Sequence, residues 1–317
     1  MNIVFMGSPD FAVPCLKALI DSGETVQAVL TQPDKARGRR GNKLMPTPVK
    51  ELALQHDIPV YQPVSLKKGD EGEQICSLLE QLAPELIVVV AYGKILPKRV
   101  LDIPKHGCIN VHASLLPRYR GAAPIQWCVL NGERETGVTT MLMAEGLDTG
   151  DMLLKSRTEI GSSETASELH DRLSEMGARL LLDTVQAVRD NSLHPEKQDD
   201  SLSNYAPMLT KDMCPLDFSM TAEQVHHKIC GLSAAPCATA YIGDRRLKLY
   251  RSELSDITSD MAVGSVVKDK YFTVVCGDGK CIRIIEVQAD GGKRMNAADF
   301  LRGNRIEAGT VLTGEPV

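Results

Sequence analysis

Short apolar runs alternate with amphipathic stretches along the first half of the chain. The runs at 2–6, 26–31 and 86–91 predict strands, and the continuous run at 86–91 is typical of a parallel strand buried on both faces. Apolar residues at helical spacing predict helices between and after these runs, the longest over 163–189. This alternation predicts an α/β fold with an open, doubly wound parallel sheet. In such sheets, ligands bind beyond the carboxyl ends of the strands, where strand order reverses.

The pattern changes beyond about residue 207. A predicted helix at 221–231 is followed by short alternating segments, separated by turn motifs such as G-D-R-R and G-D-G-K. Strands are expected at 238–242, 246–252, 264–268, 272–276 and 281–287, and they predict a smaller barrel-like β domain. We therefore expect one domain at 1–190, a polar and aperiodic linker at 191–206, and a second domain at 207–317.

Composition is that of an ordinary globular protein, with 43% hydrophobic and 24% charged residues among 317. No run approaches the roughly 18 apolar residues that a membrane-spanning helix requires, and the N-terminus lacks the features of a signal peptide. The nine cysteines include no C-x-x-C pair, which favours reduced thiols over a disulfide framework or a zinc cluster. We expect a cytoplasmic protein that acts as a monomer and has no membrane partner.

The stretch 107–121, G-C-I-N-V-H-A-S-L-L-P-R-Y-R-G, carries the most distinctive candidate chemistry. Asn110 and His112 are two positions apart on a predicted strand, so both side chains leave the same face. Asp148 lies in the glycine-punctuated loop E-G-L-D-T-G-D, and a carboxylate beside an imidazole favours its charged form. An amide and an imidazolium together suit the stabilisation of an oxyanion in acyl transfer. The alternatives are a structural histidine and an aspartate that only accepts backbone N–H bonds in its turn.

Other candidate sites are weaker. Gly7 begins the motif G-x-P-x-x-A, which lacks both G-x-G-x-x-G and a Walker lysine, so a plain turn is favoured over a nucleotide site. His106 and His112 are six positions apart with no third ligand, so no metal site is expected. No serine or cysteine is arranged as an obvious nucleophile.

A basic stretch interrupts the periodic pattern after the second predicted strand. From residue 35 to residue 43 the chain carries five basic residues, three of them arginine, and no acidic residue. The formal net charge of −5 argues against a protein coated in nucleic acid but is compatible with a local basic patch. A flexible basic loop beside an active site suits the binding of a phosphate backbone, and a solvated connection is the alternative.

At N-V-H-A-S-L-L-P-R-Y-R-G-A-A-P-I-Q and E-G-L-D-T-G-D-M-L the sequence resembles the folate-dependent formyltransferases. The stretches T-Q-P-D-K-A-R-G-R-R-G-N-K-L-M-P-T-P-V-K and V-V-V-A-Y-G-K-I-L-P are similar to the members that act on methionyl initiator tRNA, and the resemblance covers nearly the whole chain. It implies a Rossmann-like doubly wound, mostly parallel sheet followed by a smaller C-terminal OB-like β-barrel domain.

The resemblance also implies the activity: transfer of formyl from 10-formyltetrahydrofolate, as co-substrate, to the α-amino group of methionine on initiator tRNA, without a metal. The family's triad matches Asn110 and protonated His112, which would stabilise the oxyanion, and Asp148, which would support the imidazolium and assist proton movement. The positions it places at the folate are Tyr92, Gly93, Lys94, Ile95, Leu96, Ser114, Leu115, Leu116, Pro117, Gly146, Leu147 and Thr149. Those it places on tRNA are Lys35, Arg37, Arg39, Arg40 and Lys43, with the β domain holding more of the stem.

Two departures from the family pattern stand out. The basic run is about one residue longer than the common G-R-G-K-K pattern, and the tryptophan often found after the first helix of the β domain is missing. A formyltransferase acting on a sugar nucleotide or on glycinamide ribonucleotide would keep the triad, as would a 10-formyltetrahydrofolate hydrolase. A non-catalytic RNA-binding protein would keep the loop and the barrel.

Overall fold

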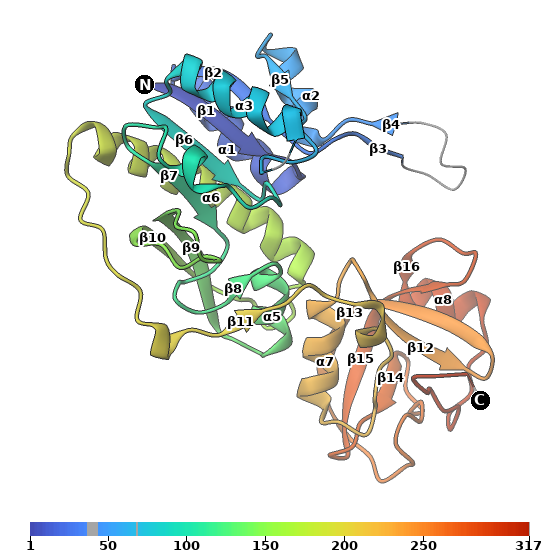
Figure 1. Ribbon diagram of the computed structural model, residues 1–317. Helices are drawn as coiled ribbons and strands as arrows, with labels where there is room; N and C mark the ends of the chain where they lie inside the picture. The colour runs from blue at the N-terminus through green and yellow to red at the C-terminus, as the bar shows by residue number, and fades with distance from the viewer. Residues whose placement is uncertain (37–43, 68, 317) are drawn as a thin grey trace. The chain divides into compact units, whose positions relative to one another are not determined.

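The computed structural model describes residues 1–36, 44–67 and 69–316, which form two compact units (Figure 1). The first unit comprises Met1–Gly121, Gly137–Thr158 and Asp171–Tyr205. The second comprises Ala122–Thr136, Glu159–His170 and Ala206–Val317. The units therefore interleave along the chain, whereas the predicted domains follow one another in sequence, so the boundaries at 190 and 207 stay a prediction.

A mostly parallel sheet forms the core of the first unit. Its strands lie in the order β10-β9-β7-β6-β1-β2-β5, parallel from β7 to β5, with β9 antiparallel to β7. Strand order reverses between β1 and β6, which is where a doubly wound sheet opens a crevice. The strands are β1 Asn2–Gly7, β2 Thr25–Leu30, β5 Val60–Tyr61, β6 Leu86–Val90, β7 Cys108–His112, β9 Glu135–Leu142 and β10 Met152–Glu159. The doubly wound, mostly parallel sheet predicted from the sequence is confirmed.

Helices cover both faces of this sheet. Ile75 and Leu79 of α3 pack with Val4 of β1 in one core cluster. On the other face, a Cβ built on Gly177 of α6 would lie 3.0 Å from the Val111 side chain, so β7 and α6 are in close contact there. The helices are α1 Val13–Asp21, α2 Pro48–Gln55, α3 Gly69–Leu82, α4 Lys98–Leu101 and α6 Ala166–Arg189.

An antiparallel sheet forms the core of the second unit, as the short alternating segments predicted. Its strands lie in the order β12-β13-β15-β14, and β16 pairs with β15. The rings of Phe272 and Phe300 stack in its core with centroids 6.2 Å apart. The elements are α5 Pro124–Leu130, α7 Ala222–Gly231, β12 Ala238–Ile242, β13 Arg245–Thr258, β14 Phe272–Val275, β15 Lys280–Ala289, β16 Met295–Asn296 and α8 Ala297–Gly303.

The strand expected at 264–268 is wrong. Ser265 and Val266 make only isolated bridges, to Val311 and Val274. Gly264 has φ +81°, a left-handed conformation that interrupts an extended strand and brings this backbone against the end of the chain. In contrast, β13 continues past the predicted end at 252, because its backbone stays paired with β15 after the apolar pattern ends.

Short elements complete the fold. The short strands are β3 Lys35–Ala36, β4 Leu44–Met45, β8 Arg120–Gly121 and β11 Tyr205–Ala206, and 3-10 turns lie at Asp10–Ala12, Asp200–Leu202 and Lys211–Met213.

Among the helices of 1–36, 44–67 and 69–316, none combines the length and apolar character that a membrane-spanning helix requires.

Candidate active site

The carboxyl ends of three parallel strands meet at one edge of the first unit's sheet. Val89 of β6 pairs with Met6 of β1 on one side and with Asn110 of β7 on the other, so the segments that follow these strands start at the same level. Val111 faces α6, so Asn110 and His112 face the opposite side of the sheet. The sheet thus presents an amide and an imidazole together, beside the point where strand order reverses.

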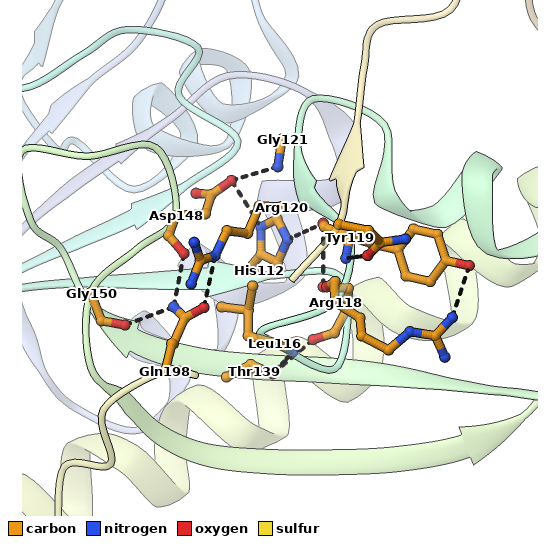
Figure 2. Close-up of polar contacts among 12 residues, drawn as sticks. His112, Leu116, Arg118, Tyr119, Arg120, Gly121, Thr139, Asp148, Gly150 and Gln198 are labelled. Carbon is orange, nitrogen blue, oxygen red and sulfur yellow. Dashed lines mark hydrogen bonds and ion pairs between the residues drawn. The ribbon is translucent and has the colours of Figure 1, made fainter. Parts of the chain in front are cut away.

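The imidazole of His112 is buried and held from one side. Its Nε2 atom lies 2.9 Å from the carbonyl oxygen of Tyr119 (Figure 2). Because a carbonyl oxygen only accepts, Nε2 carries the proton of this contact. The other ring nitrogen, Nδ1, faces Asp148, whose Oδ2 atom is 3.7 Å away. That separation is longer than a hydrogen bond and leaves the Nδ1 edge as the side of the ring on which a substrate can act.

The loop that carries Asp148 folds back over the sheet to reach His112. Since β9 runs antiparallel to β7, His112 lies opposite Thr139, whereas β9 ends at Leu142, three residues further along β9 and opposite the start of β7. Three residues of strand span about 10 Å, and the loop after β9 must cover this distance to bring Asp148 beside His112. Gly150 permits the tight return, because a Cβ there would lie 1.6 Å from the Leu142 carbonyl oxygen.

Asp148 itself sits at the top of this loop. Its φ of +52° is left-handed, a conformation that aspartate tolerates better than most residues. Its Oδ2 atom accepts the backbone N–H of Gly121 at 2.9 Å, and its side chain is 14% exposed. One carboxylate oxygen therefore meets both Gly121 and the ring edge of His112.

Asn110 is half-buried at the same edge. In the residues that the structure describes, its side-chain amide has no hydrogen-bond partner, so its donors remain available to a ligand. An amide N–H, an imidazole edge and a nearby carboxylate form a set that can stabilise an oxyanion and move a proton. The structure thus brings together the three residues predicted as catalytic.

The predicted folate positions after β6 divide into buried and exposed side chains. Tyr92 and Leu96 lie in the core, whereas Ile95 is 67% exposed. Gly93 has φ +74°, and Lys94 donates to the carbonyl oxygen of Val64 at 2.9 Å. Partial burial lowers the pKa of Lys94. Of these side chains, Ile95 has the exposure to pack on a ligand, and the others shape the backbone around it.

The predicted folate positions after β7 form a locked turn. The Ser114 hydroxyl donates to the Arg118 carbonyl oxygen at 2.6 Å. The Leu116 N–H donates to Thr139 Oγ1 at 3.2 Å (Figure 2). Thr139 in turn donates to the Ser114 carbonyl oxygen at 2.7 Å. Leu115 and Pro117 are half-buried, and the Leu116–Pro117 bond is cis. The turn is therefore held against β9.

In the third predicted group, the Asp148 loop exposes an apolar side chain. Leu147 is 56% exposed. A Cβ on Gly146 would lie 2.4 Å from the Thr149 hydroxyl, so these two positions are packed against each other. Like Ile95, Leu147 is apolar and exposed, and it directly precedes the candidate catalytic Asp148 in sequence.

Of the predicted tRNA-binding residues, only Lys35 lies within the described part of the chain. It is exposed and pairs with Met45 in the β3–β4 hairpin. Asp34, at the base of this hairpin, accepts from Lys50 at 2.7 Å and from Gln62 at 2.6 Å, and these hydrogen bonds lower the pKa of its carboxyl group. The other members, Arg37, Arg39, Arg40 and Lys43, lie outside the described residues.

Sequence reasoning missed the residues that support the site. Gln198 and Asn204 lie in the stretch taken for a linker, and both bond to the segments around His112 and Asp148. Nothing in their spacing signals this, because a polar, aperiodic stretch looks the same whether it is solvated or bonded to the protein.

In the ranges described, no group of three or more His, Cys, Asp or Glu side chains is arranged to hold a metal ion.

Comparison with known proteins identifies the family of the chain. The model of the formyl transferase family matches residues 1–185, and that of the formyl transferase C-terminal domain matches residues 208–305. The chain is 52% identical to methionyl-tRNA formyltransferase of Pelobacter propionicus (99% of this chain, 96% of the relative) and 51% identical to that of Trichlorobacter lovleyi (98% and 96%). A solved N-formyltransferase from Helicobacter canadensis shares the fold at 20% identity and a TM-score of 0.66, over 89% of this chain and 98% of the other. The chain therefore belongs to the formyl transferase family, and these curated relatives are methionyl-tRNA formyltransferases.

Proposed function

We propose that the protein transfers the formyl group of 10-formyltetrahydrofolate to the α-amino group of methionyl initiator tRNA, the step that prepares this tRNA for translation initiation. The observation that carries this proposal is the 52% identity, over 99% of the chain, to a methionyl-tRNA formyltransferase. A folate donor is further supported by the Helicobacter canadensis enzyme, whose structure is a complex with folinic acid and an amino-sugar nucleotide.

The catalytic proposal assigns a role to each of the three grouped side chains. The neutral amine attacks the formyl carbon, and the carbonyl oxygen becomes an oxyanion. The Asn110 amide and the Nδ1–H of the His112 imidazolium donate to that oxyanion, because Nε2 is already bonded to Tyr119. Asp148 lies 3.7 Å from Nδ1, close enough to support the positive ring without occupying its N–H.

The proton of the attacking amine must also be moved. Asp148 is the carboxylate at the site, and we infer that it relays this proton, through water, to the folate nitrogen that leaves. The new bond joins the amine nitrogen to the formyl carbon, and the bond that breaks joins this carbon to the folate nitrogen. No charge is left over, because the proton lost by the amine is gained by the leaving nitrogen.

The substrate-binding assignments follow the same logic. We infer that the folate ring packs near the exposed side chains of Ile95 and Leu147, with backbone groups of the turns after β6 and β7 as its polar partners. Lys35 and the four basic residues outside the described part are proposed to bind tRNA phosphates or end bases. The antiparallel β domain is proposed to hold more of the acceptor stem.

One experiment tests this function. Labelled formyl is followed from 10-formyltetrahydrofolate to charged initiator tRNA, uncharged tRNA, an amino-sugar nucleotide, glycinamide ribonucleotide and water. We expect label on the charged tRNA alone. Label on either small amine at a comparable rate, release of formate, or tRNA binding without transfer would each replace the proposal with one of the alternatives.

A further inference from the structure

Gln198 lies in the stretch predicted to be a linker, yet its side chain bonds to the loop of Asp148. We propose that Gln198 is a positioning residue for formyl transfer, which holds the Asp148 carboxylate at the reacting groups. This inference rests on the proposed function and extends it to a residue whose side chain contacts Arg120 and the loop of Asp148.

The Gln198 amide uses all of its hydrogen-bonding groups in the frame of the site. Its Nε2 atom donates to the carbonyl oxygens of Asp148 and Gly150, each at 2.8 Å, and its Oε1 atom accepts from Arg120 Nε at 2.9 Å (Figure 2). Carbonyl oxygens only accept and a guanidinium only donates, so the orientation of the amide is unambiguous. The contact therefore has a defined direction: N–H groups toward the loop, oxygen toward Arg120.

The Asp148 loop needs such a contact, because it is exposed and folds back over the sheet. Residues 144–147 are exposed, and Asp148 has a left-handed backbone. Just before Gln198, the backbone of Glu196 exchanges two hydrogen bonds with Met152, at 2.8 and 2.9 Å. This pair fixes the start of β10 and brings the Gln198 side chain to the loop.

The same segment also supports His112, from the other side. Asn204 accepts the N–H of Tyr119 with its side chain and the N–H of Arg120, at 3.0 Å, with its carbonyl oxygen. Tyr119 is the residue whose carbonyl oxygen holds His112 Nε2. Arg120 thus links the support of the ring to the support of the carboxylate, and the segment 198–204 sets the distance between Nδ1 and Oδ2.

The test replaces Gln198 with glutamate. Gln198→Glu keeps the volume and the acceptor for Arg120, but it removes both donors to the loop carbonyls. A displacement of about 1 Å at a reacting group costs up to about 100-fold, so we expect kcat to fall about 10- to 100-fold with KM for the charged tRNA within about twofold. The matched control is Gln186→Glu on the exposed face of α6, where the amide accepts from Arg189 at 3.0 Å and donates to Asp190 at 2.8 Å. It should leave kcat unchanged.

A double-mutant cycle separates positioning from a general structural role. If Gln198 acts through Asp148, Gln198→Glu should slow the Asp148→Asn enzyme by less than twofold in single turnovers. Amide exchange of residues 143–151 should also be faster in Gln198→Glu than in Gln186→Glu. An unchanged kcat in Gln198→Glu, or effects of Gln198→Glu and Asp148→Asn that multiply, would overturn the inference. Wild-type protein that transfers no formyl, or Asp148→Asn with full activity, would instead overturn the proposed function.

Discussion

The two ring nitrogens of His112 have different surroundings, and this difference gives the two edges of the imidazole different roles. Nε2 is bonded to the Tyr119 carbonyl oxygen at 2.9 Å, whereas Nδ1 faces Asp148 across 3.7 Å. A backbone carbonyl thereby determines which edge of the ring a substrate meets. The sequence placed Asn110 and His112 on one face, but it contains no information on which nitrogen would be free.

Replacing His112 with alanine tests its catalytic role. We expect kcat to fall about 10²- to 10³-fold under saturating substrates, the usual cost of losing one donor to an oxyanion. The control is His194→Ala, which removes an exposed imidazole. Turnover of His112→Ala near that of His194→Ala, in protein with the same unfolding profile, would contradict the role.

Helices and strands are the scale at which sequence patterns predict best, and the exceptions have identifiable causes. Continuous apolar runs predicted β1 and β6 because burial on both faces requires apolar residues at every position. The pattern did not predict β13 beyond residue 252, where the strand is extended by backbone pairing with β15. None of the side chains at 253–258 is fully buried, so apolar and polar residues do not alternate there.

Helix α7 contains a buried histidine whose surroundings predict a pH dependence. His226 Nε2 is bonded to the Ser162 carbonyl oxygen at 2.7 Å, and Nδ1 lies 2.9 Å from the Ser252 hydroxyl. Burial lowers the pKa of His226, despite the opposing effects of the Ser162 carbonyl and the charge of Glu253. Burial also lowers the pKa of His227, and the charge of His226 lowers it further. Both rings therefore stay neutral in the folded second unit below the pH at which they charge in the unfolded chain.

The sign of the effect follows from proton uptake. Below the unfolded histidine pKa of about 6.5, the unfolded chain binds a proton that the folded His226 does not, so stability falls as pH falls. We expect His226→Gln to remove up to about 1.4 kcal/mol per pH unit of this slope between pH 6.5 and 5. Urea unfolding, followed by fluorescence of Trp127, the chain's single tryptophan, reports on the same unit. An equal slope in wild type and His226→Gln would refute this; His194→Gln is the exposed control.

At the scale of the whole molecule, sequence order and spatial grouping differ. Residues 122–136 and 159–170 belong with the C-terminal part of the chain in the second unit, although they precede the predicted linker. The predicted linker, in turn, holds the site of the first unit through Gln198 and Asn204. The grouping of residues into the two units therefore does not follow a single boundary in the sequence.

Binding of tRNA involves the charge of the whole molecule. The net charge of −5 opposes binding, so a local basic patch must supply the attraction for the phosphates. We expect Arg37→Ala, Arg39→Ala or Arg40→Ala to weaken use of charged tRNA and to leave folate affinity within about twofold. Each phosphate contact that is lost should reduce the slope of log affinity against log salt by about one. Arg157→Ala, on a strand of the catalytic sheet, is the control. Equal loss of folate and tRNA binding in these arginine variants would contradict the assignment.

Sequence patterns predicted the parallel sheet, the antiparallel second core and the three candidate catalytic side chains. These features depend on the spacing of apolar residues and on residue type, both of which can be recognised within a single stretch of the chain. Tertiary structure alone decided the return of the Asp148 loop, the free edge of His112 and the supporting role of Gln198. Each of these depends on contacts between residues at least 7 and up to 78 positions apart. The polar groups that make these contacts leave no pattern in the sequence around them.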